Sequence, residues 1–207
     1  KKKPKEGASD FELSMTGTER KAAMSLASIY ALRMLGLFMI LPVFALYAET
    51  LDGVTPLMIG LAIGIYGLTQ AIFQIPFGML SDRIGRKPVI AMGLLIFAFG
   101  SVVAAMADSI FWVIIGRALQ GSGAIAAAIM ALTSDLTREE NRTKAMAMIG
   151  GSIGLSFAFA LIIGPIISNW VGVDGIFWIT AVLAIAGIGV LYKIVPTPIN
   201  SRFHRDT

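Results

Sequence analysis

The decisive stretch of this sequence is Gly78-Met79-Leu80-Ser81-Asp82-Arg83-Ile84-Gly85-Arg86-Lys87, which separates two long apolar runs. The run on each side is long enough to cross a bilayer as a helix. Because so few residues connect the runs, we expect one membrane helix to end near Leu80 and the next to begin near Pro88, packed against it. Gly78 and Gly85 permit this approach, since glycine accepts positive φ and lets backbones come close.

The same stretch concentrates charge at the membrane face. Asp82 lies among Arg83, Arg86 and Lys87, so one carboxylate is surrounded by three cations. Charge-assisted hydrogen bonds between such groups can hold two segments together. We therefore interpret the cluster as a candidate conformational latch. The alternative is a solvated turn whose cations only mark the cytoplasmic side of the membrane.

Composition predicts an integral membrane protein. Of the 207 residues, 56% are hydrophobic and 14% are charged, against roughly 45–50% and about 25% in soluble domains. The net charge is +4, but the cations lie at the ends of apolar segments, so we expect no nucleic-acid binding. The chain has no Cys, no His within a helix and no carboxylate pair within a helix. We therefore expect no enzyme, no cofactor and no metal site.

The apolar runs predict an all-α membrane protein with six transmembrane helices. Each run is near or above the roughly 20 residues that span a bilayer. Several joints between the runs are short, which favours antiparallel neighbours in a compact bundle. The bundle is expected over 22–196, after an N-terminal tail over 1–21 and before a linker that starts within 197–207. The predicted helices are about 23–47, 57–79, 88–107, 110–133, 143–168 and 175–195.

The positions of the cations predict the orientation of these helices. Lys and Arg are enriched in short cytoplasmic loops. Of the 17 cations, 15 fall in the N-terminal tail, around the second and fourth joints, or at the end of the chain, whereas the other joints carry only acidic charges. We therefore expect both ends of the segment to be cytoplasmic. The chain begins at Lys1 rather than Met and stops in a polar stretch, so we also expect a piece of a longer protein.

Two arginines lie inside predicted helices, where a charge is costly unless it faces a polar interior or a partner. Arg117 shares a helix face with Gln120, and a functional role is favoured over snorkelling to the membrane surface. Arg33 lies near the middle of the first predicted helix, where snorkelling is harder. For Arg33, anion binding or helix bridging and a structural hydrogen bond to a neighbouring helix are both open.

A polar stripe lies on the second predicted helix. Tyr66, Gln70 and Gln74 fall at i, i+4 and i+8, so they share one face. The stripe either lines a solute path or bridges to another helix, and bridging is favoured because glutamine makes good neutral contacts between helices. No acidic residue lies within a helix core, so proton coupling would need a carboxylate at a helix end or elsewhere in the protein.

These motifs resemble those of a known family. Gly78-x-Leu80-x-Asp82-Arg83-x-Gly85-Arg86-Lys87 is similar to the signature between helices 2 and 3 of the major facilitator superfamily. Arg117-Ala118-Leu119-Gln120-Gly121 resembles the fourth-helix motif of its drug/proton antiporter branch. Gly164-Pro165 resembles the core of the antiporter motif, although residues 166–169 replace the glycines that follow there. The runs 64–70 and 142–147 look like those of the YajR-type group of bacterial exporters.

The resemblance implies one half of a twelve-helix transporter, built from two three-helix inverted repeats. It implies alternating access with proton-coupled efflux of small molecules across the bacterial inner membrane, in partnership with the lipid bilayer and a missing C-terminal half. Asp82 would attract a helix N-terminus of that half, and Arg86 would pair with Asp135. The latch would comprise Gly78, Asp82, Arg83, Gly85, Arg86, Lys87 and Asp135. The substrate path or coupling residues would be Arg33, Tyr66, Gln70, Gln74, Arg117, Gln120, Gly164 and Pro165.

Two other functions fit the same residues. Within transport, the alternative is an importer or facilitator of a small solute. Outside transport, the alternative is a six-helix membrane scaffold, which a complete gene without a second bundle would favour.

Overall fold

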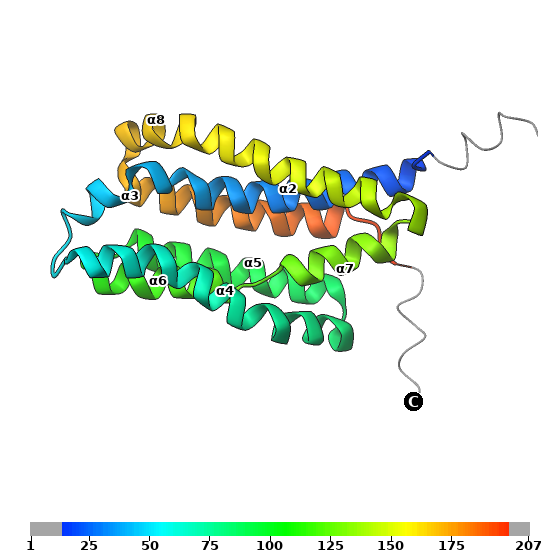
Figure 1. Ribbon diagram of the computed structural model, residues 1–207, viewed down its shortest axis with the longest axis horizontal. Helices are drawn as coiled ribbons and strands as arrows, with labels where there is room; N and C mark the ends of the chain where they lie inside the picture. Colours follow the sequence, from blue (N-terminus) through cyan, green and yellow to red (C-terminus); the bar gives the residue numbers. More distant parts are fainter. Residues whose placement is uncertain (1–13, 199–207) are drawn as a thin grey trace, which may run out of the picture.

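The computed structural model describes residues 14–198, and within this range it is built from helices that run alongside one another (Figure 1). Five helical stretches are long and apolar enough to cross a membrane: Gly17–Ala48, Pro56–Ile84, Arg86–Ala105, Ile110–Leu136 and Glu139–Lys193. The expected all-α class is therefore confirmed. The helices are α2 (Gly17–Met39), α3 (Leu41–Ala48), α4 (Pro56–Ile84), α5 (Arg86–Ala105), α6 (Ile110–Ser122), α7 (Ala126–Leu136) and α8 (Glu139–Lys193).

The longest helix, α8, is divided by a glycine. Its 55 residues include Gly172, whose φ of 73° and ψ of 177° are not helical, and whose positive φ glycine adopts readily. Figure 1 shows α8 reversing direction, with its yellow arm and its orange arm on either side of α2. We call residues 139–171 the first arm and 173–193 the second arm. The break falls within the joint that was predicted between 168 and 175.

Both arms are joined to α2 by side-chain hydroxyl groups. Ser152 and Ser156 of the first arm donate to the carbonyl oxygens of Ala27 and Ala31, each over 3.1 Å. Thr180 of the second arm donates to the carbonyl oxygen of Gly36 over 3.1 Å. Because such bonds replace no helical bond and reach across the interface, they fix α2 between the two arms.

Two membrane spans contain breaks. The hydrogen-bond ladder is interrupted between α2 and α3 at Ile40, which keeps helical dihedral angles and lies two residues before Pro42, a residue without an N–H to continue the ladder. A second break, at residues 123–125, separates α6 from α7. It interrupts the helix that was predicted over 110–133. The prediction did not include this break because an apolar run alone does not indicate one.

The charged turn is tighter than predicted. Helix α4 continues to Ile84 and α5 begins at Arg86, so Gly85 alone connects them. Gly85 has a φ of 104°, which L side chains rarely adopt. The predicted ends near Leu80 and Pro88 mark where the apolar residues stop, whereas the polar residues beyond them continue the helices.

The start of α2 also differs from its prediction. Residues 17–21, which were assigned to the tail 1–21, are helical because Thr16 and Glu19 form a capping box. The rest of that tail, residues 1–13, and most of the predicted linker, residues 199–207, lie outside the described residues.

The cation-rich joints meet at one end of the bundle. The start of α2, the α4–α5 turn, the α7–α8 junction and the end of α8 all lie at the right of Figure 1. The α3–α4 connection and the reversal of α8 lie at the left. Within residues 14–198, the fold therefore gathers on one side the cation-rich joints from which the orientation was predicted. We call this side the cation-rich end.

Packing leaves parts of α4 and of the first arm of α8 uncovered, as it also leaves parts of α5 and of the second arm, such as Phe99 and Val182. Helix α4 exposes large apolar side chains such as Leu57, Leu68 and Ile75. A Cβ added at Gly60, Gly64 or Gly67 of α4, or at Gly150, Gly151 or Gly154 of the first arm, would meet no atom within 4 Å. These small residues therefore make no close helix contact within the described residues.

Helix α6, in contrast, packs closely against α4, and a glycine at this contact allows the packing to be tested. A Cβ at Gly121 would lie 2.2 Å from the carbonyl oxygen of Tyr66 on α4, and such overpacking costs about 1–3 kcal/mol. We expect Gly121→Ala to lower the thermal unfolding midpoint of the purified protein. Gly150→Ala is the control, because helix propensity alone should leave its midpoint unchanged or raised. Equal midpoints for the two variants would contradict the packing.

Candidate functional site

The predicted latch residues come together where the α4–α5 turn meets the end of α7. Arg86 donates from Nη1 to the carboxylate of Asp82 and, over 2.7 Å, to Oγ of Ser81. Its Nε donates over 3.3 Å to Oδ2 of Asp135. The Arg86–Asp135 pair is therefore present. Both acids are well exposed, so each pair alone contributes only about 0–1 kcal/mol.

The other latch residues have different surroundings. Nζ of Lys87 donates over 2.6 Å to the carbonyl oxygen of Val195, beyond the end of α8, and over 3.3 Å to Oγ1 of Thr197. A Cβ at Gly78 would lie 3.3 Å from Cβ of Ala127, so Gly78 brings α4 close to α7. Arg83 is exposed and makes no ion pair within residues 14–198. The turn is thus tied to α7 and to the segment after α8.

Arg33 of α2 is buried inside the bundle, with 1% of its surface exposed. Its Nη1 donates over 2.5 Å to the carbonyl oxygen of Gly123, and Nη2 donates over 3.5 Å to that of Gln120. Both carbonyls lie at the C-terminal end of α6, where carbonyls lack a partner along their own helix. Nη2 also donates over 3.2 Å to the hydroxyl of Tyr66. The contacts that the structure shows for Arg33 are therefore bridges between helices.

Arg117 of α6 lies in the same polar network, with 3% of its surface exposed. Its Nε donates over 3.2 Å to the carbonyl oxygen of Ala62, and its Nη1 over 3.2 Å to Oε1 of Gln120. The guanidinium carbon lies 5.1 Å from the ring centre of Tyr66, within range of a cation–π contact. Gln120 donates in turn over 2.8 Å to Ser101. Arg117 is therefore buried between α4 and α6 instead of reaching the membrane surface.

This arginine network, which we define as Arg33, Tyr66, Ser101, Arg117 and Gln120, holds two positive charges without a carboxylate among its contacts in the described chain. Arginine stays protonated in proteins. Carbonyl, amide and hydroxyl oxygens and aromatic faces stabilise both cations. Nε of Arg33 is buried and has no hydrogen-bond partner within residues 14–198. The network thus retains a capacity to donate one further hydrogen bond.

The polar stripe of α4 divides into two parts. Tyr66 is buried and bridges to α2 through Arg33, as favoured from the sequence. Gln70 and Gln74 line a pocket of about 490 Å³, together with Tyr66, Gly67, Ala71 and Ile75. Oε1 of Gln70 has no partner within the described residues. Both glutamines are half-buried and border this pocket, and the Oε1 atom of Gln70 is buried, which fits the alternative interpretation of the stripe.

Gly164 and Pro165 lie in the first arm of α8. A Cβ at Gly164 would lie 2.3 Å from the carbonyl oxygen of Met39, the last residue of α2. Gly164 thus allows the first arm to approach α2 next to its break. The structure places this pair at the α2–α8 interface, and neither residue belongs to the arginine network.

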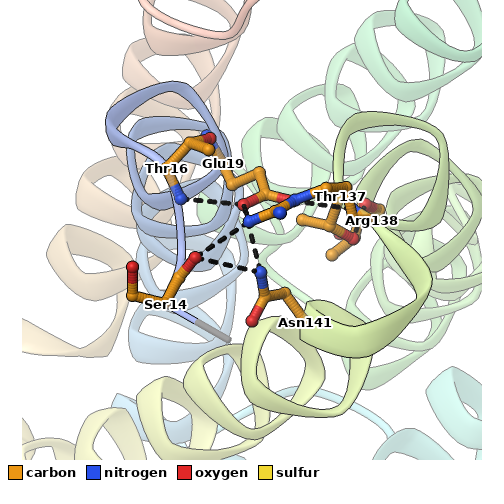
Figure 2. Close-up of polar contacts among 7 residues, drawn as sticks. Ser14, Thr16, Glu19, Thr137, Arg138 and Asn141 are labelled. Carbon is orange, nitrogen blue, oxygen red and sulfur yellow. Dashed lines mark hydrogen bonds and ion pairs between the residues drawn. The ribbon is translucent and has the colours of Figure 1, made fainter. Parts of the chain in front are cut away.

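One polar cluster at the cation-rich end was not predicted from the sequence. Glu19 is buried, with 5% of its surface exposed, and accepts hydrogen bonds from Thr16, Arg138 and Asn141 (Figure 2). The pattern Thr16-x-x-Glu19 is a capping-box signal. It was available from the sequence, but it fell within the segment assigned to a tail.

Comparison with known proteins identifies the family. The family model described as Major Facilitator Superfamily matches residues 26–206. The chain is 57% identical, over 196 residues, to the inner membrane transport protein YajR of Escherichia coli strain K12; the match covers 95% of this chain and 43% of that protein. It is 32% identical, over 155 residues, to the class B tetracycline resistance protein of Escherichia coli, covering 72% of this chain and 37% of that protein.

The fold is also similar to that of a solved transporter. The crystal structure of the human organic anion transporter MFSD10 matches with a TM-score of 0.72 and 20% sequence identity, covering 87% of this chain and 48% of that one. The chain thus spans less than half the length of each of these three proteins. On the family match and the identity to YajR, the chain belongs to the Major Facilitator Superfamily.

Proposed function

We propose that this chain is the N-terminal half of a transporter that exports small molecules across the bacterial inner membrane by alternating access, coupled to proton uptake. The observation that carries the proposal is the Asp82–Arg86–Asp135 cluster, which joins the three helices α4, α5 and α7 at one end of a bundle of this family. An ion cluster at one end can stabilise one of two conformations while leaving the interior unchanged.

The helix arrangement supports six membrane crossings. At roughly 1.5 Å per residue, the 55 residues of α8 would span about 80 Å, more than twice the roughly 30 Å of hydrocarbon. We therefore count its two arms as two crossings, which with the other four spans makes six. Two groups of three helices fit the inverted-repeat pattern of such transporters.

The uncovered face of α4 and the first arm supports a missing partner bundle. Its open glycines permit close helix contact, and the pocket at Gln70 and Gln74 opens on the same helix. We infer that this face meets the C-terminal half and that the two glutamines offer neutral hydrogen-bonding groups to a small substrate. Arg117 and Gln120 lie one helix away and would contribute to coupling.

The names of the relatives favour efflux over import. One is a tetracycline resistance protein and another an inner membrane transport protein, and resistance by a transporter is consistent with export. Because the described helix cores hold no Asp or Glu, the proton carrier would lie in the C-terminal half or at a helix end.

The proposed orientation can be checked by cysteine labelling, because the chain has no Cys of its own. The exposed residues Arg83 and Glu140 lie at the cation-rich end, and the exposed residues Asp52 and Asp108 belong to joints without cations. We expect an impermeant thiol reagent outside intact cells to label Cys at 52 and 108 and to spare Cys at 83 and 140. The opposite pattern would place the cation-rich end outside the cell.

The proposed mechanism predicts a specific effect of Asp82→Asn in the full-length protein. The substitution removes a charge that would attract a helix N-terminus, a contribution of about 0.3–2 kcal/mol. The ratio of outward-facing to inward-facing molecules should therefore fall roughly two- to thirty-fold. Distances between spin labels on the two halves report this ratio, and Glu139→Gln, which removes an exposed acid at the same end, should leave it unchanged.

Transport by the same variants completes this test. In inverted membrane vesicles, addition of an exported solute should partly collapse an imposed proton gradient. We expect Asp82→Asn to weaken this response and Glu139→Gln to preserve it. A solute that crosses without discharging the gradient would contradict proton-coupled efflux and favour a facilitator. Unchanged distances and transport in Asp82→Asn would reduce the turn to a topology signal.

A further inference from the structure

We propose that Glu19 is a positioning residue of the transport cycle, which fastens the cation-rich ends of α2, α7 and α8 together and so holds Asp135 in place for Arg86. The inference rests on the proposed function, because it gives Glu19 a part in the same conformational change. Its structural basis is the Glu19 cluster, which comprises Ser14, Thr16, Glu19, Arg138 and Asn141.

The carboxylate of Glu19 accepts five hydrogen bonds from groups within residues 14–198. Oε1 accepts from the backbone N–H of Arg138 over 2.7 Å and from its Nε over 3.1 Å. Oε2 accepts from Nη2 of Arg138 over 3.2 Å, from Nδ2 of Asn141 over 3.2 Å and from the backbone N–H of Thr16 over 2.8 Å. Figure 2 shows these groups converging on one carboxylate. A buried charge that is surrounded in this way is stable, whereas the same charge without its donors would be costly.

The carboxylate also lies at the N-termini of two helices. Glu19 is the third residue of α2 and reaches back to its N-cap, Thr16. Arg138 is the N-cap of α8, and its backbone N–H points at Glu19. Helix N-termini carry partial positive charge, so one anion is attracted by both helix dipoles. Glu19 therefore joins the starts of α2 and α8 through backbone as well as side-chain contacts.

The cluster lies next to the latch along the chain. Only Leu136 and Thr137 separate Arg138 from Asp135. Thr137 closes the end of α7 by donating over 2.7 Å to the carbonyl oxygen of Thr133. A displacement of Arg138 would therefore move Asp135, whose carboxylate contacts Arg86. This short, hydrogen-bonded connection links Glu19 to the Asp135–Arg86 pair.

The other acids near the start of α8 lack this arrangement. Glu139 and Glu140 lie in its first turn but are exposed to solvent, whereas Glu19 is buried. Each can interact with the dipole of α8, but of these three acids only Glu19 links α8 to α2 within residues 14–198. Glu140 therefore offers a matched control: the same charge at the same helix end, without the link.

The first experiment tests whether Glu19 holds the α7–α8 junction in this chain. Loss of a hydrogen bond to a charged acceptor should speed amide exchange about tenfold or more. Hydrogen–deuterium exchange of the peptide that contains Arg138 should therefore rise by that factor in Glu19→Gln and stay unchanged in Glu140→Gln. Unchanged exchange in Glu19→Gln would overturn the fastening role. This result does not depend on whether the protein transports anything.

The second experiment tests whether Glu19 acts through Asp135 in the full-length protein. Spin-label distances give the ratio of outward-facing to inward-facing molecules for Glu19→Gln, Asp135→Asn and the double variant. If Glu19 acts through Asp135, the double variant should match Asp135→Asn, with no further change in the ratio. Independent fold-changes that multiply in the double variant, or no change in Glu19→Gln, would overturn the positioning role.

If Glu19→Gln fails to insert into the membrane, a milder variant can replace it in the test. Asn141→Ala removes one donor to Glu19 and leaves the Glu19–Arg138 pair intact. It should shift the ratio in the same direction as Glu19→Gln, by a smaller factor, and again have no effect when Asp135 is Asn. Faster exchange with an unchanged ratio would leave the proposed function standing and make the cluster purely structural.

Discussion

The structure depends most on the contact between the buried guanidinium of Arg33 and the carbonyl groups at the broken end of α6. In hydrocarbon no water is present to bind a free carbonyl, so a break in a membrane helix must be satisfied from within the protein. Arg33 supplies that partner from α2, through Gly123 and Gln120. The break, in turn, gives a buried cation the oxygen atoms that it needs. Neither feature would be stable alone.

This contact fixes helices that are distant in the sequence. Arg33 belongs to α2, Tyr66 to α4 and Gly123 to the α6–α7 break, and the Arg33 guanidinium also lies 4.8 Å from the ring centre of Phe97 on α5. At the cation-rich end, Arg86, Lys87 and Glu19 add contacts to α7, to the segment after α8 and to the α7–α8 junction. The bundle is thus fastened at its centre and at one end.

The sequence predicted the features that depend on local pattern. The charged turn and the apolar spans follow from hydropathy and from a motif with fixed spacing, whereas the Arg86–Asp135 pair was implied by the resemblance to the family. The α6–α7 break and the Glu19 cluster were not predicted, because each is stabilised by residues about 90 and 120 positions away. Gly123 and the capping box of Glu19 were visible signals, but neither indicates which distant group will bind there. Gln70 and Gln74 could not be assigned for a similar reason, since their spacing on α4 does not indicate which group lies opposite them.

The most direct test of this account is whether the Arg33–Gly123 contact exists in a lipid bilayer. Solid-state NMR can measure the dipolar coupling between ¹⁵N in arginine side chains and ¹³C in glycine carbonyls, with Arg33→Met as the reference that identifies the Arg33 signal. The contact of Nη1 with the carbonyl oxygen over 2.5 Å places the Gly123 carbonyl carbon within reach of this measurement, so it predicts a coupling in the wild-type protein that is lost in Arg33→Met. Identical spectra for the two proteins would contradict the claim that a buried arginine satisfies the broken helix.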